Sequence, residues 1–142
     1  MTPERITVSA EIDAETAKIV EDGLARFNEL HNGPDPTKPL WLICRDDQGH
    51  VLGGLKGLIQ WDWFVVLTLW VEEERRRQGI GQRLLREAED AARNHACRRV
   101  RLATMTFQAP EFYRKLGYAE ECRLLDVPPG HAYIWMTKTL AD

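Results

Sequence analysis

The sequence has too few cysteines, and apolar runs that are too short, for several classes of protein. Its three cysteines, Cys44, Cys97 and Cys122, are far apart and form no CxxC pair, which argues against a structural zinc site and against a disulfide framework. No apolar run reaches the length of a membrane-spanning helix, and the N-terminal residues lack the apolar core of a signal peptide. We therefore expect a cytoplasmic protein with free thiols that binds no metal and no membrane.

The chain also lacks the excess of basic residues that is typical of nucleic-acid-binding proteins. It has 19 Lys and Arg against 22 Asp and Glu, a formal net charge of −3, so we expect no nucleic-acid partner. A length of 142 residues, with 44% hydrophobic and 29% charged residues, is ordinary for one soluble domain that buries a core. We predict a single domain over residues 1–142.

Hydrophobic spacing predicts a chain of mixed strands and helices. Residues 5–12 are β-branched and roughly alternating, which predicts a first strand. Apolar residues then recur at helical spacing from Ala17 to Leu30, behind the capping residue Asp13, which predicts a helix that ends near Leu30. Residues 31–39 contain three prolines and a glycine, the composition of an irregular loop.

The rest of the chain predicts a fold of the α/β class, of the α+β type. Further strands are predicted over residues 40–46, 51–60, 64–71, 99–106, 119–127 and 131–140, and helices over residues 80–98 and 109–118. Residues 64–71 form a continuous apolar run, which is typical of a central strand buried on both faces. Three glycines in the preceding strand, Gly53, Gly54 and Gly57, indicate a bulge or a close approach by another group.

The stretch "RRRQGIGQRLL", between the central strand and the next helix, has the composition of an anion-binding site. The first N–H groups of a helix have no partner inside the helix, and they lie at its positive end. Gly79 and Gly81 leave those N–H groups accessible, and Arg76, Arg77 and Arg83 add positive charge. The pattern suits a pyrophosphate, although neither the P-loop string nor the third glycine of a dinucleotide fingerprint is present. The other interpretation is a solvated arginine run balanced by Glu72–Glu74.

Two motifs in this order resemble those of the GNAT N-acetyltransferase superfamily. The pattern R-x-x-G-x-G is met by Arg76, Gly79 and Gly81, and the pattern A-x-x-F-Y-x-x-x-G-[FY] by Ala109, Phe112, Tyr113, Gly117 and Tyr118. The resemblance extends over residues 50–140. It implies the GNAT fold, a mixed and mostly antiparallel sheet of six to seven strands that is splayed at the central strand and flanked by about four helices.

The resemblance further implies an acyltransferase that moves an acetyl group from acetyl-CoA to an amine through a ternary complex. The residues that it assigns to acetyl-CoA are Leu69, Trp70, Val71, Arg76, Arg77, Gln78, Gly79, Ile80, Gly81, Gln82, Gln108, Ala109, Phe112 and Tyr113. The N–H groups from Gln78 to Gln82 would hold the pyrophosphate, and the backbone of residues 69–71 would pair with pantetheine. Thr106 stands where many family members have asparagine, so nearby Gln108 is expected to contact the pantetheine instead.

The same resemblance implies one catalytic side chain. Tyr113 matches the family tyrosine that points at the sulfur, and a phenol can donate a proton to a departing thiolate. A backbone N–H of Leu69 or a neighbour would stabilise the charge that develops on the thioester oxygen. No general base is assigned, although Asp62, Glu11, His31 and His131 are candidates.

The expected acceptor is the amine of a small molecule, and the alternative is a protein lysine or N-terminus. Two readings from other classes are a non-catalytic acyl-CoA-binding module and a nucleic-acid-associated protein that uses Arg75–Arg77; the net acidity of the chain speaks against the second. Family members often pair through terminal strands, which makes a homodimer possible.

Overall fold

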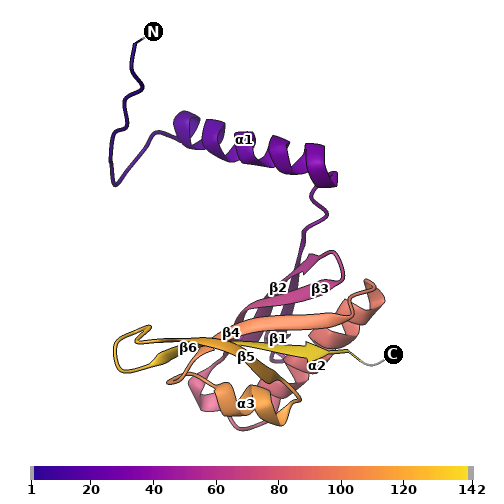
Figure 1. The fold of residues 1–142 in the computed structure, drawn as a ribbon. Coiled ribbons are helices and arrows are strands. Elements are labelled where there is room, and N and C mark those ends of the chain that lie inside the picture. The colour runs from indigo at the N-terminus through magenta and orange to yellow at the C-terminus, as the bar shows by residue number, and fades with distance from the viewer. Residues whose placement is uncertain (1, 141–142) are drawn as a thin grey trace. The chain divides into compact units, whose positions relative to one another are not determined.

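The computed structural model describes residues 2–140, which form six strands, three α-helices and one short 3₁₀ helix (Figure 1). The helices are α1 (Ala14–Asn32), α2 (Ile80–Asn94) and α3 (Pro110–Lys115), and the 3₁₀ helix covers Glu73–Arg75. The strands are β1 (Lys38–Arg45), β2 (Val51–Gln60), β3 (Trp63–Val71), β4 (Arg99–Met105), β5 (Ala119–Leu125) and β6 (Ala132–Thr139). The predicted fold class is confirmed, with three α-helices in the described chain where about four were expected. The chain divides into two compact units, Met1–Asp35 and Pro36–Asp142.

The first unit is built around helix α1, which begins and ends where the sequence predicts. Asp13 caps its start, because the Asp13 carboxylate accepts a hydrogen bond of 2.9 Å from the N–H of Thr16. Gly33 follows its last residue with a φ of 79°, a left-handed conformation that favours glycine, and its N–H donates to the carbonyl of Glu29. The helix is therefore stopped by backbone geometry before the prolines that follow.

The predicted strand over residues 5–12 is wrong, because these residues form no strand in the described chain. A strand is stable only when its backbone N–H and C=O groups pair with a neighbouring strand. The hydrogen bonds that the structure gives to this segment are local ones between Ser9 and Glu11. The alternating sequence is thus present without a pairing partner.

The second unit is a six-stranded sheet with the strand order β1-β2-β3-β4-β6-β5. All neighbouring strands are antiparallel except β3 and β4, which run parallel. The parallel pairing is short, since it joins only Trp63–Val66 to Arg99–Leu102. Beyond Val66 the two central strands no longer pair, so the sheet opens at its centre.

A bulge in β3 accompanies this opening. The register between β2 and β3 shifts after Lys56, which pairs with Thr68, whereas the next residue, Gly57, pairs with Val66. Leu67 is therefore the extra residue, and the strand bends there. The prediction that β3 is buried on both faces is correct for residues 64–66 and wrong for Leu67, Thr68 and Trp70, which are exposed because β3 has left β4.

The residue opposite this bulge, Gly57, has no room for a side chain. A Cβ atom at Gly57 would lie 2.2 Å from the Phe64 ring, far inside van der Waals contact. The sequence predicted a close approach by another group to the glycines of β2, and this approach is present at Gly57. The group is the fully buried Phe64 ring, which lies under β2.

Helices α2 and α3 pack on one face of the sheet and form the core with it. The apolar stripe of α2, from Ile80 through Leu84 and Leu85 to Ala92, is buried against strand residues such as Leu55 and Ile134. The packing of α2 on the sheet fixes the start of α2 against the end of β3.

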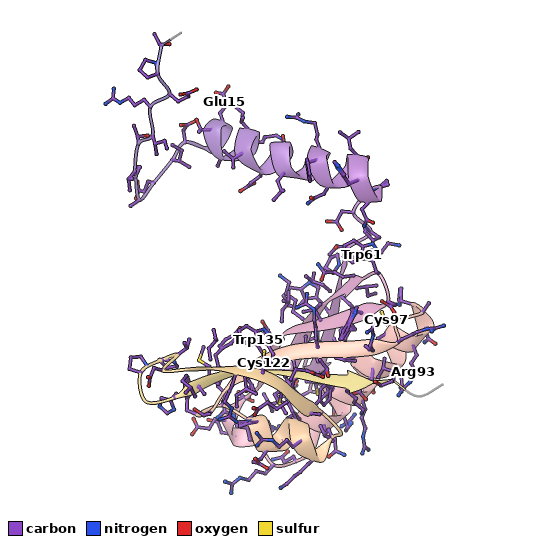
Figure 2. The ribbon with its side chains drawn as sticks, in the orientation of Figure 1. Glu15, Trp61, Arg93, Cys97, Cys122 and Trp135 are labelled. Atoms are coloured by element: carbon purple, nitrogen blue, oxygen red, sulfur yellow. The ribbon has the colours of Figure 1, made fainter. Side chains whose placement is uncertain are left out.

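The three cysteines are free thiols, with Cys97 beyond the end of α2 and Cys122 on β5 (Figure 2).

Candidate active site

The start of α2 presents unpaired backbone N–H groups. Gly79 precedes the helix with a φ of 84°, and Arg77 also has a left-handed φ of 64°. In the described chain no acceptor faces the N–H groups of residues 78–82, and the first N–H with an acceptor is that of Arg83, which donates to the carbonyl of Gly79. These free donors lie at the positive end of a 15-residue helix, where an anion is favoured.

A cavity of about 510 Å³ opens in front of these N–H groups. Its lining residues are Leu69, Val71, Arg75, Arg76, Arg77, Gly79, Ile80, Gly81, Gln82, Ala109, Phe112 and Tyr113. All but one of them were assigned to the cofactor from the sequence. Arg75 is the exception: the sequence motif does not include it, although its place in the arginine run could have suggested it.

The cavity has a strongly positive lining. Three arginines line it and no acidic residue of the described chain does. The Nε of Arg76 donates to the carbonyl of Val71, with 3.0 Å between the two atoms, which ties the loop to the end of β3. No ion pair joins Arg75–Arg77 to Glu72–Glu74 in the part of the chain that the structure describes. The interpretation in which these glutamates neutralise the arginines is therefore not supported.

The two glycines of the motif have different roles. A Cβ atom at Gly79 would meet nothing within 4 Å, so this side of the loop is open. A Cβ atom at Gly81 would lie 3.5 Å from Cζ of Phe112 and 3.7 Å from Cγ2 of Val71. Glycine at position 81 therefore leaves space between two cavity-lining side chains, whereas Gly79 supplies a backbone conformation.

A second cavity of about 330 Å³ lies in the opening between β3 and β4. Its lining residues are Val66, Leu67, Thr68, Leu69, Leu102, Ala103, Thr104, Gln108, Ala109 and Tyr113. Leu69, Ala109 and Tyr113 line both cavities. These three residues therefore border both cavities, where the sheet has opened.

Tyr113 is held at this junction by packing. Its ring contacts those of Phe112 and Tyr118 edge-on, with centroid separations of 5.1 and 5.8 Å. Burial raises the pKa of Tyr113 to about 12, because a phenolate is poorly solvated there. With this raised pKa the phenol stays protonated at neutral pH. Its hydroxyl has no hydrogen-bond partner among the described residues, so it is free to donate a hydrogen bond.

Three residues that the sequence assigned to the cofactor lie outside the first cavity. Trp70 is half-exposed and lines neither cavity. The Gln78 side chain donates to the carbonyl of Glu74. Gln108 lines the second cavity, where its Oε1 accepts a hydrogen bond of 2.8 Å from the N–H of Met105. Arg83, expected beside the glycines, lines a separate groove between α2 and β1.

None of the candidate general bases lines either cavity. Glu11 and His31 belong to the first unit. Asp62 forms an ion pair with Arg99 at 3.3 Å, and His131 shares a hydrogen bond of 3.1 Å with the Thr106 hydroxyl. The described residues that line the two cavities include no carboxylate and no imidazole.

Residues 2–140 contain no group of three or more His, Cys, Asp or Glu side chains placed to hold a metal ion. Within the same residues, no helix has both the length and the apolar character required to cross a membrane.

A positive helix start that faces a cavity, next to an opening in the sheet, is an arrangement suited to a phosphate-containing cofactor. The chain belongs to the acetyltransferase (GNAT) family, because its residues 9–118 match that family. It is 32% identical over 126 residues to an acetyltransferase of Agrobacterium fabrum, covering 89% of this chain and 92% of that one. The protein is therefore an acetyltransferase enzyme, and proteins of this family use acetyl-CoA.

Two more relatives extend the comparison. The chain is 41% identical over 85 residues to the blasticidin-S acetyltransferase of Streptomyces morookaense; the alignment covers 59% of this chain and 62% of that enzyme. The chain thus spans less than two thirds of the length of this relative. The crystal structure of an acetyltransferase from Bacillus cereus matches with a TM-score of 0.84 and 28% identity, over 94% of this chain and 98% of that one.

Proposed function

We propose that the protein transfers an acetyl group from acetyl-CoA to the amine of a small molecule, while both substrates are bound. The observation that carries this proposal is that Tyr113 borders both cavities, together with Leu69 and Ala109. One cavity is suited to a polyanion, and the other is an opening in the sheet that a second substrate can enter. A binding module without catalysis would need only the first.

The residues present fit the diphosphate of acetyl-CoA. The N–H groups of residues 78–82 have no other acceptor in the described chain, and Arg75–Arg77 line the same space. Open space beside Gly79 leaves room for a group larger than a single carboxylate. Acetyl-CoA, when bound, supplies an acetyl group activated as a thioester.

The edge of β3 supplies the groups that would stabilise the reacting carbonyl. Beyond Val66, β3 no longer pairs with β4, so the N–H groups on that edge are available as donors. A backbone N–H aimed at the thioester oxygen lowers the barrier as negative charge develops there, and one such donor is typically worth about 10²–10³ in rate. Leu69, which lines both cavities, is the residue from which we expect this donor.

Tyr113 would act on the departing sulfur through a hydrogen bond. When the amine nitrogen bonds to the acetyl carbon and the carbon–sulfur bond breaks, the sulfur gains the electron pair. A thiol has a pKa of about 8.5, well below the pKa of about 12 to which burial raises Tyr113. The phenol therefore keeps its own proton while it stabilises the thiolate, and the proton that completes the thiol comes from the acylated ammonium or from water.

The acceptor amine must lose a proton before it attacks. Because no carboxylate or imidazole lines either cavity among the described residues, we infer that this proton passes to water and not to a side chain. The small-molecule class of acceptor is supported by the Streptomyces relative, whose name gives blasticidin S as its substrate.

A panel of small-molecule amines tests this function, with each amine incubated with the protein and acetyl-CoA. We expect an N-acetylated product from at least one of them, detected by mass spectrometry. Acetylation of peptide lysines or N-termini alone would contradict the small-molecule acceptor. Binding of acetyl-CoA without any acetylated product would contradict catalysis at this site.

A further inference from the structure

Three polar side chains form a buried cluster that the proposed mechanism does not use. The carboxylate of Glu89, a residue of α2 that is 4% exposed, accepts hydrogen bonds from the Tyr118 hydroxyl at 2.7 Å and from the Lys138 ammonium at 3.0 and 3.1 Å. Tyr118 is buried as well, and the Lys138 side chain is partly buried. None of the three lines either cavity. We call these three residues the buried cluster.

The buried cluster is expensive to place in the core. Lys138 follows Ile134 and Met136 at alternate positions of β6, so it lies on the side of the sheet that packs against the helices. A carboxylate and an ammonium lose hydration there, and apolar residues of similar volume often stabilise a core equally well or better. A fully paired polar network differs from apolar packing because it rigidifies its surroundings. Fold stability alone therefore does not account for charges at this place.

Tyr118, between α3 and β5, links the buried cluster to Tyr113 in two ways. The N–H of Tyr118 donates to the carbonyl of Tyr113 at 3.0 Å, and the two rings are in edge-on contact with their centroids 5.8 Å apart. Burial raises the pKa of Tyr118, and its hydrogen bond to Glu89 raises that pKa further, so the hydroxyl stays protonated and continues to donate. The position of Tyr118 therefore limits where Tyr113 can lie.

Lys138 supports the turn that joins these two tyrosines. Gly117 has a φ of 96°, and a Cβ atom placed on it would lie 3.3 Å from Cε of Lys138. The stem of the lysine thus lies against the backbone just before Tyr118, and its ammonium lies 5.5 Å from the centre of the Tyr118 ring. Main chain and ring are both confined at the end of α3.

Helix α3, which carries Tyr113, depends on contacts of this kind. It has six residues, Pro110–Lys115, and a helix this short is not stable by itself, so its orientation is set by what it packs against. Glu89 belongs to α2, the helix whose first residues line the first cavity. The buried cluster therefore connects Tyr113 to the helix that faces the cofactor cavity.

We propose that Glu89 and Lys138 are positioning residues for Tyr113 and act through Tyr118. Glu89 holds the Tyr118 hydroxyl from α2, and Tyr118 holds the ring and the carbonyl of Tyr113. The Tyr113 hydroxyl is thereby kept where the residue borders both cavities. This inference rests on the hydrogen bond from Tyr113 to the departing sulfur that is part of the proposed function.

Tyr118→Phe tests the connection, because it removes one hydroxyl and keeps the ring beside Tyr113. We expect an unchanged Kd for acetyl-CoA and a kcat that is lower by about threefold to tenfold, since a displaced group loses part of its effect. Added to Tyr113→Phe, the same change should alter kcat by less than about twofold, because the hydroxyl that is positioned is then absent. A loss of the same size in both backgrounds would overturn the proposal. So would a native kcat in Tyr118→Phe beside a lowered kcat in Tyr113→Phe.

An apolar version of the buried cluster separates positioning from stability. The triple variant Glu89→Met/Tyr118→Phe/Lys138→Met leaves no charge of the cluster unpaired, so its Tm should equal or exceed that of the native chain. Its kcat should nevertheless fall as it does in Tyr118→Phe. The control Ile59→Val, a core change in β2 outside both cavities, should lower the Tm and leave kcat unchanged. A native kcat in the triple variant, beside a lowered kcat in Tyr113→Phe, would contradict positioning.

The Tyr113 ring can also be observed without acetyl transfer. The chain has three tyrosines, so protein with ring-¹³C-labelled tyrosine gives three sets of ring signals, which Tyr→Phe variants assign. In the triple variant the Tyr113 ring should flip at least about tenfold faster, because the network that rigidifies its surroundings is gone, whereas the Tyr133 ring should be unaffected. An unchanged flip rate of Tyr113 would overturn the proposal. A faster flip combined with a native kcat in Tyr113→Phe would uphold the positioning and refute the proposed role of the Tyr113 hydroxyl.

Discussion

Replacing Gly81 with alanine separates the stability of α2 from its use as an anion site. The new Cβ would lie 3.5 Å from Phe112 and 3.7 Å from Val71, which are ordinary van der Waals distances, so the fold can accept it. Alanine inside a helix is more favourable than glycine by roughly 0.5–1 kcal/mol. We therefore expect Gly81→Ala to raise the free energy of unfolding by about that amount.

The same methyl group occupies the space in front of the helix N–H groups. Phe112, Val71 and Gly81 all line the cavity, so a side chain between them moves a bound diphosphate away from its donors. Loss of one hydrogen bond to a charged group is worth about 1.5–3 kcal/mol. The Kd for acetyl-CoA should therefore rise about tenfold to a hundredfold.

Gly79→Ala is the matched comparison, because its effect on stability has the opposite sign. Gly79 has a φ of 84°, and a left-handed conformation costs a residue with a Cβ roughly 1–2 kcal/mol. Thermal unfolding and calorimetric titration with acetyl-CoA measure both quantities for both variants. An unchanged Kd in Gly81→Ala would refute the reasoning, as would a loss of stability in Gly81→Ala equal to that in Gly79→Ala.

Three further predictions concern the buried tyrosine and its surroundings. Tyr113→Phe should leave the Kd for acetyl-CoA unchanged and lower kcat at least tenfold, measured beside the exposed control Trp61→Phe; equal kcat values would remove the hydroxyl from the mechanism. Because the free amine is the reactive form and burial raises the pKa of Tyr113 to about 12, kcat/KM should rise with pH up to the pKa of the acceptor, and a fall between pH 8 and 10 would contradict this. Lys138→Met should destabilise the fold by about 3–5 kcal/mol in urea unfolding, because it removes the ammonium that lies 3.0 Å from the buried Glu89 carboxylate, which among the described residues then keeps the Tyr118 hydroxyl at 2.7 Å. A change below 1 kcal/mol would show that the pair is not needed.

Local signals in the sequence predicted the elements that depend on local interactions. Asp13 and Gly33 fix the ends of α1 through hydrogen bonds to residues three or four positions away. The glycines and arginines at the start of α2 likewise act through backbone conformation and local charge. Most of the residues assigned to the cofactor therefore line one cavity.

The features that the sequence did not reveal depend on distant partners. The apolar run of β3 does not show where β3 leaves β4, since that point is set by the bulge at Leu67 opposite β2. Residues 5–12 have the alternating pattern of a strand, but a strand forms only where its backbone can pair with the free edge of another strand. Trp70 lies shortly before the arginine–glycine motif and lines neither cavity, because the residue after Leu69 points to the other face of the strand.

Backbone amide resonances report most directly on the central claim, that the N–H groups at the start of α2 bind the diphosphate of acetyl-CoA. The protein, labelled with ¹⁵N, is titrated with acetyl-CoA and the shift of every assigned amide is followed. The largest shifts are expected for residues 78–82, together with slower exchange of their amide hydrogens with solvent. Saturable binding that leaves these amides unmoved while others shift would contradict the account.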